Sequence, residues 1–168
     1  LSFQSIKNGI KRYKGVRRRF DIKGLLSNIL IVDDYAHHPS EIKATINSAK
    51  AGWNRRIIAV FQPHLFTRTK EFFKQFAEAL KIADIVIISE IYGAREKPIE
   101  GVTSALIFLE LKRKMQNKCI LLSNLIELER TLDKILEPGD LLLTMGAGDI
   151  WRYNESYVEH MKKRLDKV

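Results

Sequence analysis

The feature that most constrains the fold is a series of short apolar runs set between segments with helical spacing. Three of these runs are Ile57–Phe61, Ile85–Ile88 and Leu141–Met145. Runs of four or five apolar residues are typical of strands buried on both faces, as in a parallel sheet. Between them, apolar residues recur at helical spacing, as at Ile42 and Ile46. Strands and helices that alternate about every 25–30 residues predict an α/β fold: a doubly wound, mostly parallel sheet with helices on both faces.

The rest of the pattern places the remaining elements. A strand is expected over residues 16–23 and another over 29–33, joined through residues 24–28. Residues 2–12 have the composition of the end of a helix. Further helices are expected over 39–52, around 72–80, over 103–115 and 125–136, with strands over 119–122 and 141–145. A chain of 168 residues predicts one domain, with a core over 15–150 and a C-terminal helix over 151–168.

The net charge of +9 is concentrated near the N-terminus. Residues 1–23 hold eight Lys or Arg and one acid, a net +7. The densest part is Arg17–Arg19, which is consistent with a site for one polyphosphate, whereas Lys7, Lys11 and Arg12 fit a solvated flank. A basic module that binds nucleic acid is the alternative, and it predicts salt-sensitive binding.

The cysteine count and the length of the apolar runs exclude two classes of protein, disulfide-rich proteins and proteins with a membrane-spanning helix. The single cysteine, Cys119, excludes an internal disulfide framework, lies within an apolar run as a packing residue would, and fits a reducing cytoplasm. No apolar run approaches the ~18 residues of a membrane helix, so no membrane partner is expected.

Polar side chains follow the expected strands at the point where each strand ends. In open α/β sheets, ligands bind beyond the carboxyl ends of the strands, so these loops predict a site. The residues concerned are Asp33, Asp34, Tyr35, His37 and His38 after one strand, Gln62, His64 and Arg68 after the next, then Glu90, Tyr92, Arg95 and Glu96, and finally Gly146, Gly148 and Asp149.

Several of these residues also have a structural interpretation. Asp33 and Asp34 precede a helix and could satisfy its backbone donors. His37 and His38 suggest a metal pair, but adjacent residues on such a turn seldom point the same way, so no metal site is expected. Arg68 near a helix start is suited to a carboxylate or phosphate. The GAG sequence at 146–148 lets backbone amides approach an anion but is a weak signal alone.

Five motifs in order are much more specific than any one of them. They are GVRRRF at 15–20, DDYAHHP at 33–39, FQPHLFTRT at 61–69, EKPIEGV at 96–102 and GAGDI at 146–150. From about residue 3 to residue 150 the chain resembles the Rossmann-like C-terminal domain of the Mur ligases of peptidoglycan synthesis. It resembles most the member that joins L-alanine to UDP-N-acetylmuramate.

The resemblance implies an ATP-dependent reaction. In that family, ATP converts the muramoyl carboxylate to an acyl phosphate, which the alanine amine attacks with Mg²⁺ present. The third domain closes over a central ATPase domain, completes the ATP site and presents the amino acid. This chain has no GxxxxGK[ST] phosphate loop, so the resemblance predicts separate N-terminal and central domains, joined through residues 1–14, that hold most of the Mg²⁺ site. The domain alone is expected to be inactive.

The resemblance also assigns roles to residues. Arg19 corresponds to an arginine that reaches the ATP phosphates, and Asp34, Tyr35 and His37 to the nucleotide side. His37, His64 and Arg68 are the candidates for the amino acid, with Arg68 on its carboxylate. Supporting positions are Asp33, His38, Gln62, Glu96, Gly146, Gly148 and Asp149.

One position departs from the family pattern. Leu65 stands where family members commonly have an arginine, so either Arg68 holds the alanine carboxylate alone or Arg95 or another group compensates. A murein tripeptide ligase of the same family shares the DD-aromatic-AHHP loop and is the alternative within the family. A dinucleotide-dependent enzyme is disfavoured, because no GxGxxG follows the first strand.

Overall fold

The computed structural model describes residues 2–12 and 15–166. Six strands form one sheet in the order β1-β2-β6-β3-β4-β5. All neighbours are parallel except β1 and β2, which form an antiparallel hairpin at one edge. The strands are β1 (Asp21–Leu26), β2 (Ile29–Asp34), β3 (Ile57–Phe61), β4 (Ile85–Ile88), β5 (Cys119–Leu121) and β6 (Leu141–Met145).

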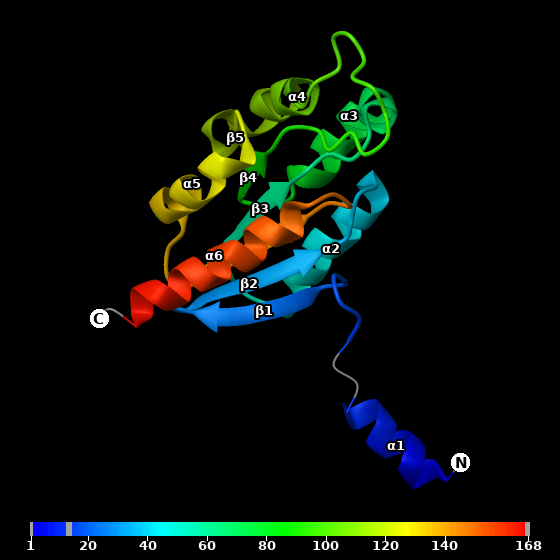
Figure 1. The fold of residues 1–168 in the computed structure, drawn as a ribbon, viewed down its shortest axis with the longest axis vertical. Coiled ribbons are helices and arrows are strands. Elements are labelled where there is room, and N and C mark those ends of the chain that lie inside the picture. The colour runs from blue at the N-terminus through cyan, green and yellow to red at the C-terminus, as the bar shows by residue number, and fades with distance from the viewer. Residues whose placement is uncertain (1, 13–14, 167–168) are drawn as a thin grey trace.

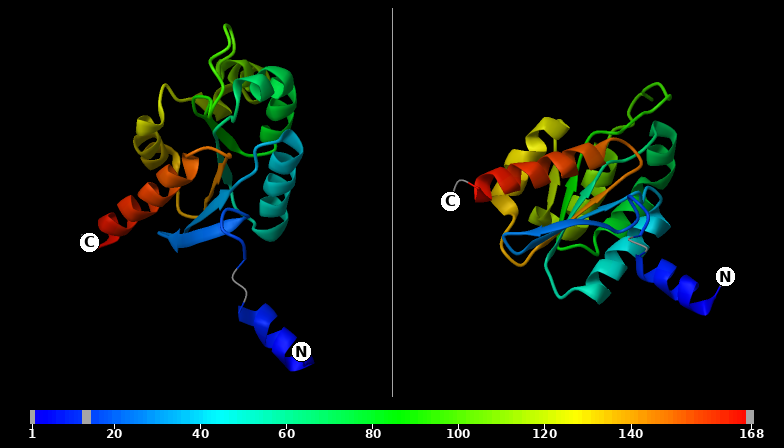
Figure 2. Two further views of the ribbon diagram at one scale, coloured as in Figure 1. Left: turned by 45° about the vertical axis from the view of Figure 1, so that its right-hand side comes forward. Right: turned by 60° about the horizontal axis from the view of Figure 1, so that its bottom comes forward.

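Helices cover both faces of this sheet (Figures 1 and 2). On one face lie α2 (Pro39–Gly52), α3 (Phe66–Leu80) and α4 (Ala105–Met115), and on the other lie α5 (Leu128–Ile135) and α6 (Ile150–Leu165). Successive side chains of a strand point to opposite faces, so Ala59 joins the core under α2–α4 while Val60 joins the core under α5 and α6. The predicted doubly wound α/β fold is confirmed.

The hairpin corrects one prediction. The strand expected over 16–23 begins only at Asp21, because residues before it form a turn in which Arg18 and Phe20 have positive φ values of 61° and 45°. The connection expected over 24–28 is shorter, since residues 24–26 continue β1. Ser27 and Asn28 alone make the turn, both with positive φ, as a two-residue hairpin of primed type requires.

The other elements lie close to their expected places. Short 3-10 turns, η1 (Gln116–Lys118) and η2 (Leu125–Glu127), precede β5 and α5, so the helix expected over 125–136 is shorter. Cys119 is buried in the core, as predicted. The N-terminal helix α1 (Phe3–Arg12) has no buried residue. Residues 1, 13–14 and 167–168, at the limits of the predicted 1–14 and 151–168 segments, lie outside the described residues.

Candidate functional site

The strand order brings the four predicted loops to one edge of the sheet. β6 lies between β2 and β3, and β4 lies beside β3, all parallel. Their carboxyl ends therefore meet, and the loops that follow them lie side by side (Figure 1). The loop of residues 35–38, between β2 and α2, contacts the loop of residues 62–65, between β3 and α3, through the rings of His37 and His64.

A set of hydrogen-bonded polar groups joins the carboxyl ends of β2 and β6 at this edge. Asp33 is 0% exposed, and its carboxylate accepts hydrogen bonds from Thr144 Oγ1 (2.9 Å) and Arg18 Nε (3.2 Å). Arg18 also donates to the carbonyl of Gly146 (2.6 Å). Burial raises the pKa of Asp33, while Thr144 and Arg18 oppose that rise. We call Arg18, Asp33, Thr144 and Gly146 the Asp33 network.

Asp34 holds two segments of backbone in place, the turn before β1 and the loop after β2. It is buried, and its two carboxylate oxygens accept backbone N–H groups of Phe20 and Ala36, both at 2.7 Å. Each oxygen retains a second lone pair. Asp34 therefore fixes the loop that carries Tyr35 and His37.

The three consecutive arginines have three different environments. Arg17 is 71% exposed and pairs with Glu155 at 3.1 Å, and Arg18 belongs to the Asp33 network. The exposed Arg19 places its guanidinium carbon 5.8 Å from the centre of the Tyr35 ring, on which Arg18 also lies at 4.9 Å. No hydrogen bond of the Arg19 side chain is found within residues 2–12 and 15–166, so its donors are available to a ligand.

The adjacent histidines point in different directions. His37 Nδ1 lies 2.9 Å from the carbonyl of Tyr35, and its ring meets the Tyr35 and His64 rings edge-on. His38 packs against Phe72 and lies 3.0 Å from Ser40 Oγ. Only His37 therefore faces the loop after β3.

His37, His64 and Arg68 come together as predicted. Arg68 Nη1 lies 3.3 Å from His64 Nδ1 and 3.4 Å from the His64 carbonyl. An arginine can only donate, so Nδ1 accepts and the ring proton lies on Nε2. Burial, and then the positive charge of Arg68, lower the pKa of His64, which favours the neutral ring near pH 7.

Tyr92 completes this cluster, although the sequence analysis did not assign it a role. Its ring stacks on His64 with centroids 5.7 Å apart, and the two residues form a parallel β-bridge. The only signal in the sequence was its position after β4. We call His37, His64, Arg68 and Tyr92 the His64 cluster. Leu65, next to it, is held at a φ of 74° by a backbone hydrogen bond to the Tyr92 carbonyl.

Gln62, Asp149 and the two glycines pack the loops together. Buried Gln62 donates to Asp149 (2.8 Å) and accepts from the backbone of Ile150 (3.1 Å), which ties β3 to the start of α6. A Cβ at Gly146 would lie 2.8 Å from the Gln62 carbonyl, and one at Gly148 would lie 2.6 Å from Tyr92 Cγ. These positions need glycine for close packing.

Glu96 caps the helix that carries Arg68. The N-terminal position of α3 is Leu65, which has no capping oxygen, and Glu96 instead accepts the backbone N–H and the hydroxyl of Thr67. These hydrogen bonds lower the pKa of Glu96. The carboxylate thus stabilises the helix start from another loop.

The carboxylates of this edge do not fit a metal ion. Asp33 and Asp34 are engaged by protein donors, and no group of three His, Cys, Asp or Glu side chains in the described part of the chain is arranged to hold a metal. Within the same residues, no helix has the length and apolar character needed to span a bilayer.

Comparison with known proteins shows the family of this chain. The family described as "Mur ligase, glutamate ligase domain" matches residues 18–148, so the chain belongs to the Mur ligase family. Its relatives include the UDP-N-acetylmuramate–L-alanine ligase of Geotalea uraniireducens, 44% identical over 98% of this chain and 36% of that protein. The corresponding ligase of Dictyoglomus turgidum is also 44% identical, over 97% of this chain and 35% of that protein. The chain thus spans about a third of the length of these relatives.

A solved structure shows the same fold. The UDP-N-acetylmuramate–alanine ligase of Thermotoga maritima superposes with a TM-score of 0.74 at 29% identity, over 96% of this chain and 35% of that one.

Proposed function

We propose that this chain is the part of an L-alanine-adding Mur ligase that completes the ATP site and binds the amino acid. The observation that carries the proposal is the His64 cluster, in which the half-buried Arg68 lies beside His64, whose lowered pKa favours the neutral ring, at the edge where α/β sheets bind ligands. The relatives with 44% identity are named for the reaction with L-alanine.

Arg68 and the two histidines form the amino-acid end of the proposed site. The guanidinium would pair with the alanine carboxylate as a charge-assisted fork. A neutral His64 does not repel the alanine ammonium, and its Nε2–H can donate to a substrate oxygen. Tyr92 forms a wall behind His64. Leu65 supplies no second cation, so Arg68 would carry the carboxylate interaction alone.

Arg19 and Tyr35 form the nucleotide end. Arg19 is exposed and its donors are open, and a guanidinium near a transferring phosphoryl group offsets developing charge. Asp34 would act mainly by holding Tyr35 and His37 in place. Mg²⁺ would accompany ATP on other parts of the enzyme, because Asp33 and Asp34 are already engaged.

The test is a chimera in which this chain replaces the matched third of the Geotalea uraniireducens ligase. The assay is phosphate release that requires ATP, UDP-N-acetylmuramate and L-alanine together. Arg68→Ala should raise KM for L-alanine by about 30- to 100-fold, and Arg19→Ala should mainly lower kcat. Lys70→Ala and Arg17→Ala are the matched controls, since both side chains are exposed neighbours of the tested ones.

Two results would overturn parts of the proposal. If the chimera folds but has no ligase activity while the parent enzyme is active in the same assay, the proposed reaction is wrong. A higher kcat/KM with glycine or L-serine than with L-alanine would agree with the proposed ligase reaction but would show that L-alanine is not the preferred amino acid.

A further inference from the structure

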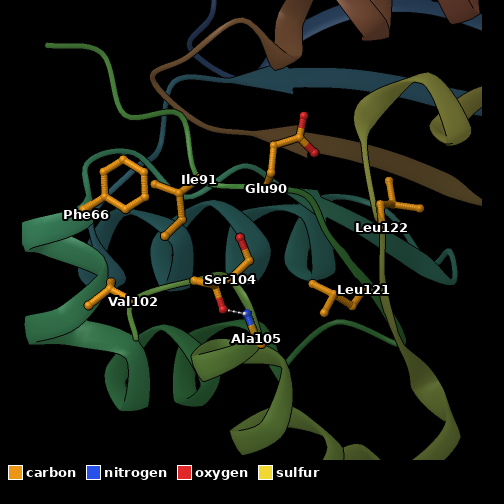
Figure 3. A pocket seen from close by; sticks show the side chains of 9 residues that line it. Phe66, Glu90, Ile91, Val102, Ser104, Ala105, Leu121 and Leu122 are labelled. Atoms are coloured by element: carbon orange, nitrogen blue, oxygen red, sulfur yellow. Dashed lines mark hydrogen bonds between the residues drawn. The ribbon is translucent and has the colours of Figure 1, made fainter. Parts of the chain in front are cut away.

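A second pocket lies beyond the carboxyl ends of β4 and β5, beside the His64 cluster but separate from it. Its volume is about 270 Å³. Figure 3 shows its walls, which come from the start of α3, the segment after β4, the start of α4 and the end of β5. Most of the lining is apolar, from Phe66, Ile91, Val102, Leu121 and Leu122.

One polar group in this wall has no hydrogen-bond partner among residues 2–12 and 15–166. Ser104 is 5% exposed, and its hydroxyl makes no hydrogen bond to any described residue. Figure 3 shows the hydroxyl directed toward the space between Ile91 and Glu90. Nearly all buried hydroxyls in native proteins are paired, because a buried unpaired hydroxyl is destabilising. The position of this hydroxyl therefore needs an explanation.

Helix capping does not explain it. Ser104 occupies the N-cap position of α4, where a serine commonly accepts a backbone N–H, but its side chain makes no such bond. The hydroxyl of Thr103 accepts the N–H of Ala105 instead, at 3.3 Å. Ser104 thus presents a donor and an acceptor to the pocket.

We propose that this pocket is a second ligand site, which binds a small, uncharged, mostly apolar molecule through a hydrogen bond to Ser104. The volume is just below that of drug-sized pockets, so it suits a ligand of fragment size. The apolar walls disfavour a charged ligand, because a charge buried against them would lose its hydration and the only ionisable lining residue, Glu90, lies at the exposed rim. The one charged neighbour, Glu90, is exposed at the rim and further disfavours anions.

The pocket shares its walls with the candidate site. Ile91 immediately precedes Tyr92, and Phe66 lies on the first turn of α3 with Arg68. Gly93 packs so closely on Phe66 that a Cβ there would lie 2.6 Å from the ring. A ligand between Phe66 and Ile91 would therefore contact the two segments that carry Tyr92 and Arg68.

The test is a titration of the ¹⁵N-labelled chain with benzyl alcohol, followed by amide chemical shifts. Toluene is the matched probe without the hydroxyl. We expect saturable shifts at Ile91, Ser104 and Leu121 with a Kd on the order of 1 mM. Toluene should bind the same residues about 3- to 10-fold more weakly, because it cannot pair with Ser104.

Two variants separate a ligand contact from a structural role. Ser104→Ala should bring the affinity for benzyl alcohol down to that for toluene and leave the unfolding midpoint unchanged or slightly higher. Ala105→Leu should fill the pocket and weaken both probes at least 10-fold. Three results would overturn the proposal: shifts that do not saturate or lie elsewhere, equal affinity of the two probes for the unmodified chain, or a loss of stability in Ser104→Ala typical of a lost cap.

Discussion

The Asp33 network and the His64 cluster lie at the same edge of one sheet, but they differ in how fully their charged groups are hydrogen-bonded within the protein. In the Asp33 network, the donors and acceptors meet one another: Thr144 donates to Asp33 and accepts from Asn154, while Arg18 joins Asp33 to the Gly146 carbonyl. In the His64 cluster, the only hydrogen-bond contacts of the Arg68 side chain with the described residues are long, at 3.3 and 3.4 Å, and both go to His64.

The difference distinguishes charged residues that stabilise the fold from charged residues that can bind a ligand, two roles that the sequence alone does not separate. A buried charge whose partners are all present fixes the geometry of the strand ends, because removing one partner leaves the other unpaired. A cation with open donors has capacity left for a ligand. Substitutions in the first set should therefore change stability, and substitutions in the second set should change binding.

The largest effect is expected from Asp33→Ala. The change leaves Arg18 without its carboxylate and removes the nearer of the two acceptors of Thr144, so it should lower the free energy of unfolding by about 3–5 kcal/mol. Urea denaturation followed by circular dichroism measures this. Glu90→Ala, at an exposed carboxylate, should stay within about 0.5 kcal/mol of the unmodified chain. A loss of stability in Glu90→Ala as large as that in Asp33→Ala would mean that the effect of Asp33→Ala does not come from the contacts of the Asp33 network.

Arg18→Ala and Arg19→Ala test the distinction on adjacent residues. Arg18→Ala removes one of the two side-chain donors to the buried Asp33 and the Arg18 donor to the Gly146 carbonyl, and should lower the free energy of unfolding by about 2–3 kcal/mol. Arg19→Ala should change stability by less than about 0.5 kcal/mol, because its side chain is exposed. The same denaturation series measures both. A stability loss in Arg19→Ala as large as that in Arg18→Ala would show that Arg19 is also structural.

These arginines show where sequence analysis reaches its limit. The apolar runs predicted β3, β4 and β6 because a strand buried on both faces leaves a local signal. Arg17–Arg19 leave no such signal, since their environments depend on Glu155, Asp33 and Gly146, far away in the chain. The turn before β1, with positive φ values at Arg18 and Phe20, was also missed: one of its contacts is local, from the Arg18 N–H to Asp21, but the other, from the Phe20 N–H to Asp34, joins residues 14 apart.

The grouping of side chains at the edge of the sheet was predicted better than the hairpin, while their roles stay predictions. The rule that ligands bind at the carboxyl ends of strands needs only the strands, so His37, His64 and Arg68 could be grouped without any contact being known. Tyr92 was not grouped with them, because its stacking on His64 depends on a β-bridge beyond the ends of β3 and β4.

Gly148→Ala should have a smaller effect than the Asp33 and Arg18 changes. A Cβ at this position would collide with Gln62 and Tyr92, and we expect a loss of about 1–2 kcal/mol as the Tyr92 ring shifts. Gly52→Ala is the matched control. No atom lies within 4 Å of its Cβ position at the end of α2, so alanine there should stabilise the chain by about 0.5–1 kcal/mol. Thermal unfolding of both variants measures the contrast, and a neutral Gly148→Ala would contradict the close packing.

The smallest expected effect on stability comes from the protonation of His64. The pKa of His64 reports its burial and its contact with Arg68 within the His64 cluster. Burial and the charge of Arg68 lower the pKa of His64 below its ordinary value near 6.5. The unfolded chain therefore binds a proton at this residue more readily than the folded chain, so stability is unaffected above about pH 6.5 and falls as the pH drops from there to the lowered pKa of the folded chain.

NMR titration of the histidine ring signals measures this pKa directly. Arg68→Ala should raise it toward the ordinary value without restoring it fully, because the burial remains. Lys70→Ala, an exposed change on the same helix, should leave it unchanged. A His64 pKa raised above about 7 in the unmodified chain would mean that most rings carry a proton at neutral pH. It would then repel both Arg68 and an incoming ammonium group, and the proposed amino-acid site would need a carboxylate that the His64 cluster does not contain.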